Sequence, residues 1–262
     1  MADTVRSIMA VAPTVGAVLG LPPLSAATER PIDEISGSLE GLSRIAVLAP
    51  DALGLSVWKR WRETMLFLTS LHGTHHLVLR SVEPTITPVN FATLVTGAAA
   101  EVHGVRDRQH TIACQSLFDL VREAGGKSVG AGQPGYTGGE FLARHADLSG
   151  RTDEASDDAV TETVIALARE HRPQFIIAQL GETDTTFHHI GPSSPDAEQV
   201  IRATDERLRL LVGELTALHY GVIVLADHGQ HDAPNTAGAG MRGDHDGSRP
   251  DEDGLVPCTW TR

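Results

Sequence analysis

The stretch Val222-Ile223-Val224-Leu225-Ala226-Asp227-His228-Gly229-Gln230 decides how this chain folds. It begins as an apolar, β-branched run, which is typical of a strand buried on both faces of a parallel sheet. Reacting groups of open α/β sheets gather at the carboxyl ends of such strands, and Asp227 and His228 fall there. Neighbouring strand residues point to opposite faces, so both side chains can serve one site only after a turn, which Gly229 permits.

The overall composition sets limits on domain number and on partners. A chain of 262 residues is long enough to bury a large core, and we expect a single domain over residues 1–262. A formal net charge of -13 argues against nucleic-acid duplexes and anionic membranes as partners. A small anionic substrate is still compatible with this charge if bound cations reverse the local field. The oligomeric state is left open.

The cysteines and the N-terminal segment bear on the cellular compartment. Cys114 and Cys258 have no CxxC spacing, which indicates neither a disulfide framework nor a zinc–thiolate site. Residues 8–27 are apolar, but three prolines interrupt the run and Asp3 opposes Arg6 in its leading segment. We therefore expect a structural segment rather than a secretory signal, and a cytoplasmic location. No apolar run reaches the length of a transmembrane helix.

Strand-like and helix-like segments alternate along the chain. Strands are expected at residues 45–51, 76–82, 127–131, 174–180 and 222–226, and helices at 12–20, 54–71, 87–100, 114–124, 157–170 and 196–217. Residues 24–43 and 132–156 are expected to form loops, the second of which would shape a substrate pocket together with residues 106–113. This alternation predicts an α/β fold with a mostly parallel sheet.

Side chains of the kind that bind metals follow several of these strands. They are Asp51, Asp184 with His188, Asp227 with His228, and His245. Mixed carboxylate and imidazole ligands suit zinc, and the oxygen-rich half would also accept manganese. Each residue alone has an ordinary explanation, since aspartates after strands often cap helices. Their repetition at several strand ends is what indicates a metal site.

A threonine marks the start of one expected helix. Thr87 followed by Pro88 is a favourable pair for an N-cap and first turn. This places a hydroxyl group at a helix N-terminus, where backbone N–H groups and the helix dipole favour an anion. A role as a helix cap alone is the competing interpretation, because most Thr-Pro pairs have no other.

Taken as a set, these motifs resemble the alkaline phosphatase superfamily, and most closely its nucleotide pyrophosphatase/phosphodiesterase branch. The matching blocks occur in the family's order between residues 45 and 257. They are Ala49-Pro50-Asp51-Ala52-Leu53, Thr87-Pro88-Val89-Asn90 with Leu94-Val95-Thr96-Gly97, His103-Gly104-Val105, Asp184-Thr185-Thr186-Phe187-His188-His189-Ile190-Gly191-Pro192, Ala226-Asp227-His228-Gly229 and Gly243-Asp244-His245. Two departures lie beside ligand positions: Asp246 stands where the family commonly has glycine, and Gln230 where it often has methionine.

The resemblance implies a three-layer α/β/α sandwich that holds two divalent metal ions, with zinc expected and manganese as the alternative. Asp184, His188 and His245 would hold one ion, and Asp51, Asp227, His228 and the Thr87 oxygen the other. Thr87 would be the nucleophile and Asn90 the amide that binds a phosphoryl oxygen. The segment from Ala12 to Ile32 resembles the one that normally closes chains of this superfamily, so a permuted N-terminal segment is expected.

The expected function is that of a two-metal phosphodiesterase, similar to nucleotide pyrophosphatases, that forms a phosphothreonine intermediate. No arginine near Thr87 is evident to clamp a phosphomonoester dianion, although Arg106, Arg108 and Arg242 stay open as candidates. The alternatives are a phosphomonoesterase or phosphonate-ester hydrolase of the same superfamily, or a non-catalytic metal-binding or assembly protein. A mutase is disfavoured because the chain has no room for the large inserted domain. A sulfatase is disfavoured because neither cysteine occupies the nucleophile position.

Overall fold

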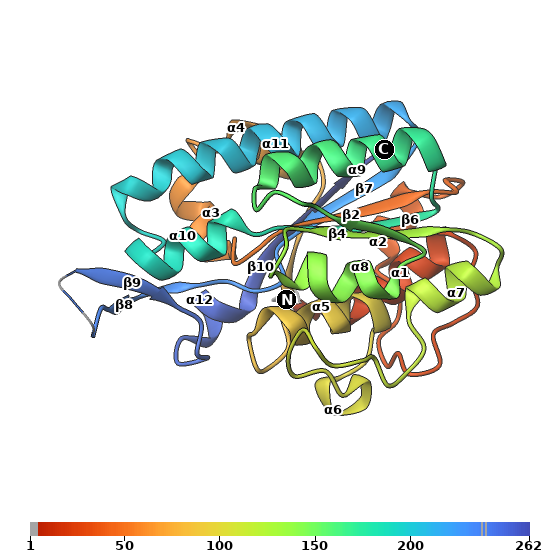
Figure 1. Ribbon diagram of the computed structural model, residues 1–262, viewed down its shortest axis with the longest axis horizontal. Coiled ribbons are helices and arrows are strands. Elements are labelled where there is room, and N and C mark those ends of the chain that lie inside the picture. The colour runs from red at the N-terminus through yellow and green to blue at the C-terminus, as the bar shows by residue number, and fades with distance from the viewer. Residues whose placement is uncertain (1–4, 237, 239) are drawn as a thin grey trace.

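A central eight-stranded sheet organises the computed structural model, which describes residues 5–236, 238 and 240–262 (Figure 1). Its strand order is β1-β3-β10-β7-β2-β6-β4-β5. The strands are β1 (Arg6–Ser7), β2 (Ile45–Pro50), β3 (His76–Arg80), β4 (Ser128–Gly132), β5 (Leu148–Arg151), β6 (Phe175–Leu180), β7 (Gly221–Leu225) and β10 (Leu255–Thr261). Only β10 among these runs antiparallel to its neighbours β3 and β7. The sheet is therefore mostly parallel, as predicted.

The centre of the sheet is apolar on both faces. On one face Val47 of β2 pairs with Ile177 of β6 and Ile223 of β7, and all three residues are buried. On the opposite face the next residue, Leu48, pairs with the buried Ala178 and Val224. Side chains of this kind lose no polar hydration when helices cover both faces, which is why the run forms central strands. The strands predicted from apolar runs at residues 45–51, 127–131, 174–180 and 222–226 are confirmed to within about two residues.

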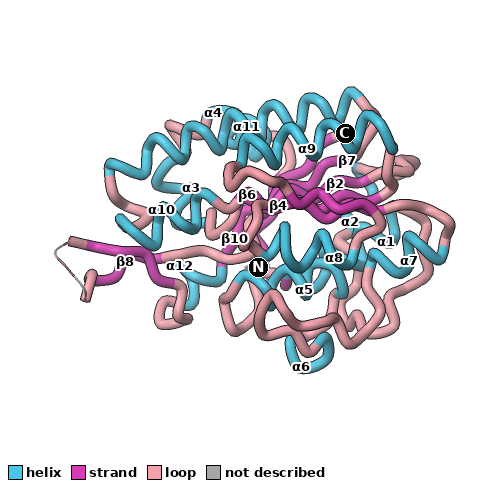
Figure 2. Tube along the Cα trace, viewed as in Figure 1, coloured by secondary structure: helices cyan, strands magenta, loops and turns pink. Residues whose placement is uncertain are grey.

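Helices cover the sheet on both faces and complete three layers (Figures 1 and 2). On one face α11 (Glu198–Ala217) packs against α9 (Asp157–His171), α4 (Leu66–His72) and α10 (Glu182–Ile190). On the other face α5 (Thr87–Thr96) packs against α1 (Val11–Val18), α6 (Ala100–His103) and α7 (Leu117–Glu123). The predicted α/β/α architecture is confirmed. No helix of the described residues is long and apolar enough to cross a membrane.

Several elements differ from the sequence prediction. The structure places α2 (Asp33–Ser38) in the expected loop 24–43, and it places a π-helical turn (Gly138–Leu142), α8 (Ala143–His145) and β5 in the expected loop 132–156. Residues 54–71 form two helices, α3 (Leu55–Trp61) and α4, instead of one. Strand β10 was not predicted, because Pro257 interrupts its apolar pattern. Helix α5 ends at Thr96 because Gly97 adopts a left-handed conformation with φ 67°.

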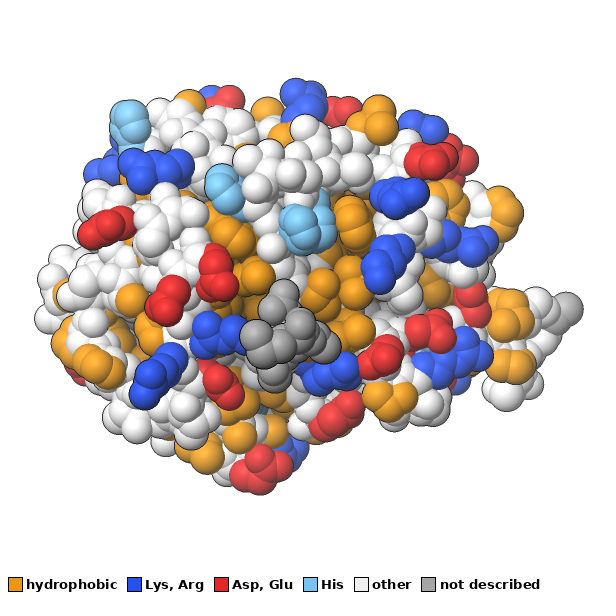
Figure 3. Space-filling view, turned by 180° about the vertical axis from the view of Figure 1, so that it is seen from behind, with side chains coloured by type: hydrophobic (Ala, Val, Ile, Leu, Met, Phe, Trp, Pro, Cys, Tyr) orange, Lys and Arg blue, Asp and Glu red, His pale blue; other side chains and the backbone are white. Residues whose placement is uncertain are grey.

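Two smaller parts flank the sheet. A hairpin of β8 (His231–Pro234) and β9 (Met241–Asp244) extends from the body, and α12 (Pro250–Gly254) follows it. The N-terminal segment joins the main body, because β1 pairs with β3 and α1 packs on α5. Its permuted origin and the single domain over residues 1–262 stay predictions. On the face in Figure 3, acidic and basic side chains are interspersed and no large area carries one sign of charge.

Two glycine variants test the packing of the sheet against its connections. A Cβ at Gly130, in β4, would lie 2.3 Å from the Leu142 carbonyl group, so Gly130→Ala should lower the free energy of unfolding by about 3 kcal/mol. A Cβ at Gly213, within α11, would meet no described atom within 4 Å apart from its chain neighbours and the backbone of its own helix, so Gly213→Ala should raise the free energy of unfolding by about 1 kcal/mol. Urea unfolding of both variants measures these changes, and equal effects would contradict the packing described.

Candidate metal centre

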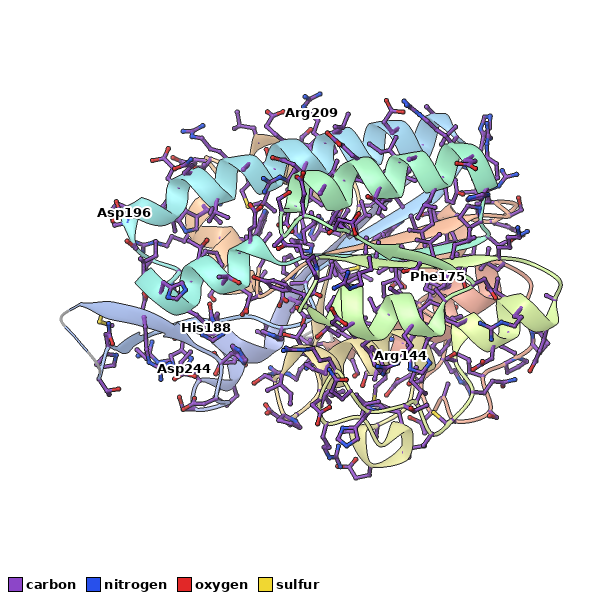
Figure 4. All side chains as sticks on the ribbon, in the orientation of Figure 1. Arg144, Phe175, His188, Asp196, Arg209 and Asp244 are labelled. Atoms are coloured by element: carbon purple, nitrogen blue, oxygen red, sulfur yellow. The ribbon has the colours of Figure 1, made fainter. Side chains whose placement is uncertain are left out.

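The predicted metal ligands meet at the carboxyl ends of the central strands. Asp51 directly follows β2, and Asp227 and His228 follow β7. Asp184 and His188 lie one turn apart on α10, which begins after β6, and His245 follows β9. Figure 4 shows His188 on the side of α10 that faces the β8–β9 hairpin, with Asp244 at the base of that hairpin, where β9 ends. Parallel strands thus bring together residues from distant parts of the chain, as the sequence predicts.

Three histidines direct the same ring nitrogen into this site. The Nδ1 atoms of His188, His228 and His245 lie 3.2, 3.0 and 2.6 Å from the backbone oxygens of Gly243, Gly229 and Thr85, respectively. A carbonyl oxygen only accepts hydrogen bonds, so each Nδ1 carries the hydrogen and each Nε2 is left to face the centre. Histidines that bind metals through Nε2 are commonly oriented in this way.

Two buried carboxyl groups form the inner end of the site. Asp51 and Asp227 are buried, and the Nε2 atom of His228 lies 3.6 Å from Asp51 Oδ1 and 3.4 Å from Asp227 Oδ2. Among the described residues, these two oxygens have no hydrogen-bond partner. Burial, followed by the negative charge of Asp227, raises the pKa of Asp51 well above its ordinary value. Burial also raises the pKa of Asp227. Two such groups need a cation between them to be ionised together.

The outer end of the site combines Asp184 with two of the histidines. His188 Nε2 lies 3.3 Å from Asp184 Oδ1 and 3.2 Å from His245 Nε2. The hydrogen bond to Asp184 raises the pKa of His188, whereas burial and then His228 lower the pKa of His245 to about 4. Burial would raise the pKa of Asp184, but the hydrogen bond from His188 and the nearby histidines hold it below its ordinary value. One cation or proton is needed between the two Nε2 atoms.

The donor atoms fit two cations side by side. Ligand atoms of Asp51, Asp227 and His228 lie within 4.8 Å of one another, and so do those of Asp184, His228 and His245. His228 therefore lies between the two sets, and the contacts of His188 add it to the second. The unpaired oxygens and the converging nitrogens are the chemistry that a divalent ion requires. The structure thus brings together all the residues predicted to bind metals.

Thr87 lies at the edge of this ligand set. It is the first residue of α5, and its Oγ1 atom is 3.2 Å from His228 Nε2. The helix begins here because Pro88 has a fixed φ angle and lacks the N–H group that a first turn leaves unpaired. The loop before it is attached to the site as well, since the Thr85 hydroxyl donates to the His245 backbone oxygen over 2.7 Å.

The structure gives Asn90 a different role from the one predicted. Its Nδ2 atom donates to the backbone oxygens of Val82, Pro84 and Ile86, and its Oδ1 atom accepts from the Val82 N–H group. The side chain is completely buried. Its amide hydrogens are therefore committed to holding the loop before Thr87, and they do not face a phosphoryl oxygen.

Gln179 is a contributor to the site that the sequence reasoning missed. This buried residue of β6 donates from Nε2 to Asp51 Oδ2, and its Oε1 accepts from the backbone N–H group of Gly138. It thereby turns the other oxygen of Asp51 towards the centre. A glutamine within an apolar central strand was the available signal, because a buried amide needs partners.

Comparison with known proteins identifies the family. The family model described as Type I phosphodiesterase / nucleotide pyrophosphatase matches residues 45–111 and 122–243. The chain belongs to this family, which is metal-dependent and lies within the alkaline phosphatase superfamily.

Individual relatives are distant and longer. Venom phosphodiesterase 2 of Crotalus adamanteus is 26% identical over 225 residues, which cover 72% of this chain and 27% of that protein. Ectonucleotide pyrophosphatase/phosphodiesterase family member 3 of Rattus norvegicus is 27% identical over 184 residues, a match that covers 60% of this chain and 21% of that protein. The chain thus spans about a quarter of the length of these curated relatives.

Solved structures share the fold. Murine ectonucleotide pyrophosphatase / phosphodiesterase 5 superposes with a TM-score of 0.61 at 19% identity, covering 73% of this chain and 58% of that one. Phosphonoacetate hydrolase from Sinorhizobium meliloti 1021, in complex with phosphonoformate, superposes with a TM-score of 0.58 at 17% identity. The match covers 75% of this chain and 59% of that one.

The variant Asp51→Asn separates metal binding from folding. It removes a buried charge that burial and Asp227 disfavour, so it should stabilise the metal-free protein by about 1 kcal/mol. It should also abolish most of the rise in melting temperature that excess zinc or manganese gives the wild type. Thermal unfolding with and without metal measures both effects. A variant that is stabilised by metal as strongly as the wild type would contradict the assignment of Asp51 as a ligand.

Proposed function

We propose that this chain is a two-metal phosphoester hydrolase that prefers diesters and acts through a phosphothreonine intermediate at Thr87. The observation that carries the proposal is the 3.2 Å contact between Thr87 Oγ1 and His228 Nε2, at the edge of the two ligand sets. A hydroxyl group that only capped a helix would not need to lie against a buried histidine whose Nε2 atom also contacts two buried carboxyl groups. Membership of the phosphodiesterase family supports the same reaction class.

The roles of the residues follow from their positions. Asp184, His188 and His245 would hold one cation, and Asp51, Asp227, His228 and the Thr87 oxygen the other. When bound, the two cations would neutralise phosphoryl oxygens and lower the pKa of the attacking hydroxyl. Zinc suits the mixed imidazole and carboxylate donors best, and manganese is the alternative.

Thr87 acts as the nucleophile. Its oxygen attacks phosphorus and the bond between phosphorus and the leaving-group oxygen breaks, so that a phosphothreonine forms and the hydroxyl hydrogen ends on the departing alcohol. Water then cleaves the bond between phosphorus and the Thr87 oxygen, which regains its hydrogen and releases a phosphomonoester. The start of α5 presents its positive dipole end to the phosphoryl group throughout. Asn90 keeps Thr87 in place through the loop that its amide braces.

A diester is the preferred substrate class. Two of the arginines considered as clamps have other partners, because Arg106 donates to the Ala100 backbone oxygen and Arg242 pairs with Asp244. A nucleotide-like diester is supported by the description of the matching family, Type I phosphodiesterase / nucleotide pyrophosphatase.

The alternatives concern the same site. A phosphomonoesterase or phosphonate-ester hydrolase would use the same residues, and a non-catalytic metal-binding protein would use only the ligands. The cytoplasmic location, the exclusion of nucleic-acid duplexes and membranes as partners, and any statement on oligomeric state rest on the sequence alone and stay open to test.

Two replacements of Thr87 test its role as the nucleophile. Thr87→Val keeps the size of the side chain without the hydroxyl, and should lower kcat for bis-p-nitrophenyl phosphate by at least about 1000-fold. Thr87→Ser keeps a hydroxyl and should retain measurable turnover. Both should bind metal, which elemental analysis checks. Equal activity of Thr87→Val and the wild type would exclude the nucleophile, and faster wild-type hydrolysis of p-nitrophenyl phosphate or phosphonoacetate would favour an alternative substrate class.

A further inference from the structure

Asp253 is a buried carboxyl group that lies outside the ligand set and binds several elements at once. It lies in α12 and is completely shielded from solvent. Its Oδ2 atom accepts from the backbone N–H groups of Gly247 and Arg249, at 3.1 and 3.4 Å, and its Oδ1 atom lies 2.6 Å from His231 Nδ1. Its backbone oxygen accepts from the Gly229 N–H group over 2.6 Å.

These bonds connect two of the histidines of the metal centre. Gly229 directly follows His228, and Gly247 lies two residues after His245. The rings of His228 and His245 are 4.4 Å apart between centroids. A single residue of α12 is therefore bonded to both of the loops that carry these rings, although the loops lie in different parts of the chain.

His231 completes this connection from the hairpin. It is 4% exposed, and it begins β8 directly opposite Asp244, the residue before His245. A carboxylate only accepts hydrogen bonds, so His231 Nδ1 donates to Asp253 Oδ1. This hydrogen bond holds β8 against α12, and β8 in turn pairs with β9, the strand that leads to His245.

The backbone around Asp253 leaves little room for adjustment. A Cβ at Gly229 would lie 2.0 Å from the Glu252 backbone oxygen, and one at Gly54 would lie 2.4 Å from the Gly229 Cα atom. The turn after His228 is thus pressed against α12 on one side and the start of α3 on the other. A shift of α12 must displace the His228 turn with it.

We propose that Asp253 and His231 form a positioning pair that fixes His228 and His245 relative to each other, and so sets the spacing of the two metal positions. This rests on the proposed function, because it assumes that these histidines bind metal. Neither member of the pair touches a substrate or acts on the reacting atoms. Their effect passes through Gly229, Gly247 and the β8–β9 hairpin.

A third metal ion at the same place is the competing use of these side chains. Ligand atoms of His231, Asp246 and Asp253 lie within 4.8 Å of one another. Both oxygens of Asp253 already accept hydrogen bonds from N–H groups, however, which favours the positioning role. Metal counting distinguishes the two uses.

Two replacements of His231 and one control test the pair. His231→Phe keeps the ring but removes the donor, whereas His231→Asn is smaller but places an amide N–H near the position of Nδ1. The control is Asp251→Asn, which alters an exposed residue of the same helix that pairs with Arg80. We expect a chelator to remove metal about 10-fold faster from His231→Phe than from the wild type. His231→Asn should recover most of the difference, and Asp251→Asn should match the wild type.

A measurement on the metal-free proteins gives a readout that does not depend on bound metal. Amide hydrogen exchange in His231→Phe should be faster at residues 227–229 and 244–249 together, and unchanged in the central strands. Exchange at both loops of His231→Phe that is as slow as in the wild type would overturn the proposal. So would metal release that is faster from the smaller His231→Asn than from His231→Phe, because release would then depend on side-chain volume and not on the N–H donor. A third equivalent of metal in the wild type that His231→Phe loses would also overturn it. If the wild type binds no metal but exchange in His231→Phe is faster at both loops together, that result would count against the proposed function and leave the connection between the loops intact.

Discussion

The site depends on two buried carboxyl groups that lie close together at the carboxyl ends of the central parallel strands. Asp51 and Asp227 are both shielded from water, and within the described chain each has an oxygen atom that no hydrogen-bond donor reaches. Protein interiors rarely leave such oxygens unpaired, because the lost hydration is not replaced. A divalent cation would resolve this constraint, and the Nε2 atom of His228, which contacts both carboxyl groups, is placed to share it. The remaining features of the site follow from the need to hold these groups in place.

Backbone atoms do much of this holding. Carbonyl groups of Thr85, Gly229 and Gly243 fix the ring orientation of the three histidines. Amide side chains fix other parts, since Gln179 orients Asp51 and Asn90 braces the loop that leads to Thr87. The metal ligands are therefore set before any cation binds, which lowers the cost of ordering them at the moment of binding. A centre of this kind is expected to change little in structure when it takes up metal.

The positions of the ligands could be predicted from the sequence, whereas their supports could not. Apolar runs that end in Asp51 and Asp227 predict buried strands. Because parallel strands align their carboxyl ends at one edge of the sheet, the same runs predict that these two side chains lie close together. The four-residue spacing of Asp184 and His188 likewise predicts one side of a helix. The role predicted for Asn90 differs from the one its contacts indicate. In a sequence, an asparagine near a presumed nucleophile looks the same whether its side chain faces the substrate or the backbone. Gln179 and Asp253 make their contacts across the fold, and no local pattern shows which groups will lie opposite them. Strand β10 was missed because Pro257 interrupts its apolar pattern, and its place between β3 and β7 is evident only in the folded sheet.

Two divalent ions per chain are the central claim of this account. Its most direct test is equilibrium dialysis of the metal-stripped protein against zinc, followed by elemental analysis of the retained metal. The account predicts two equivalents per chain at saturation, with Asp227→Asn retaining fewer than two. Saturation with less than one equivalent, or full retention by Asp227→Asn, would contradict it.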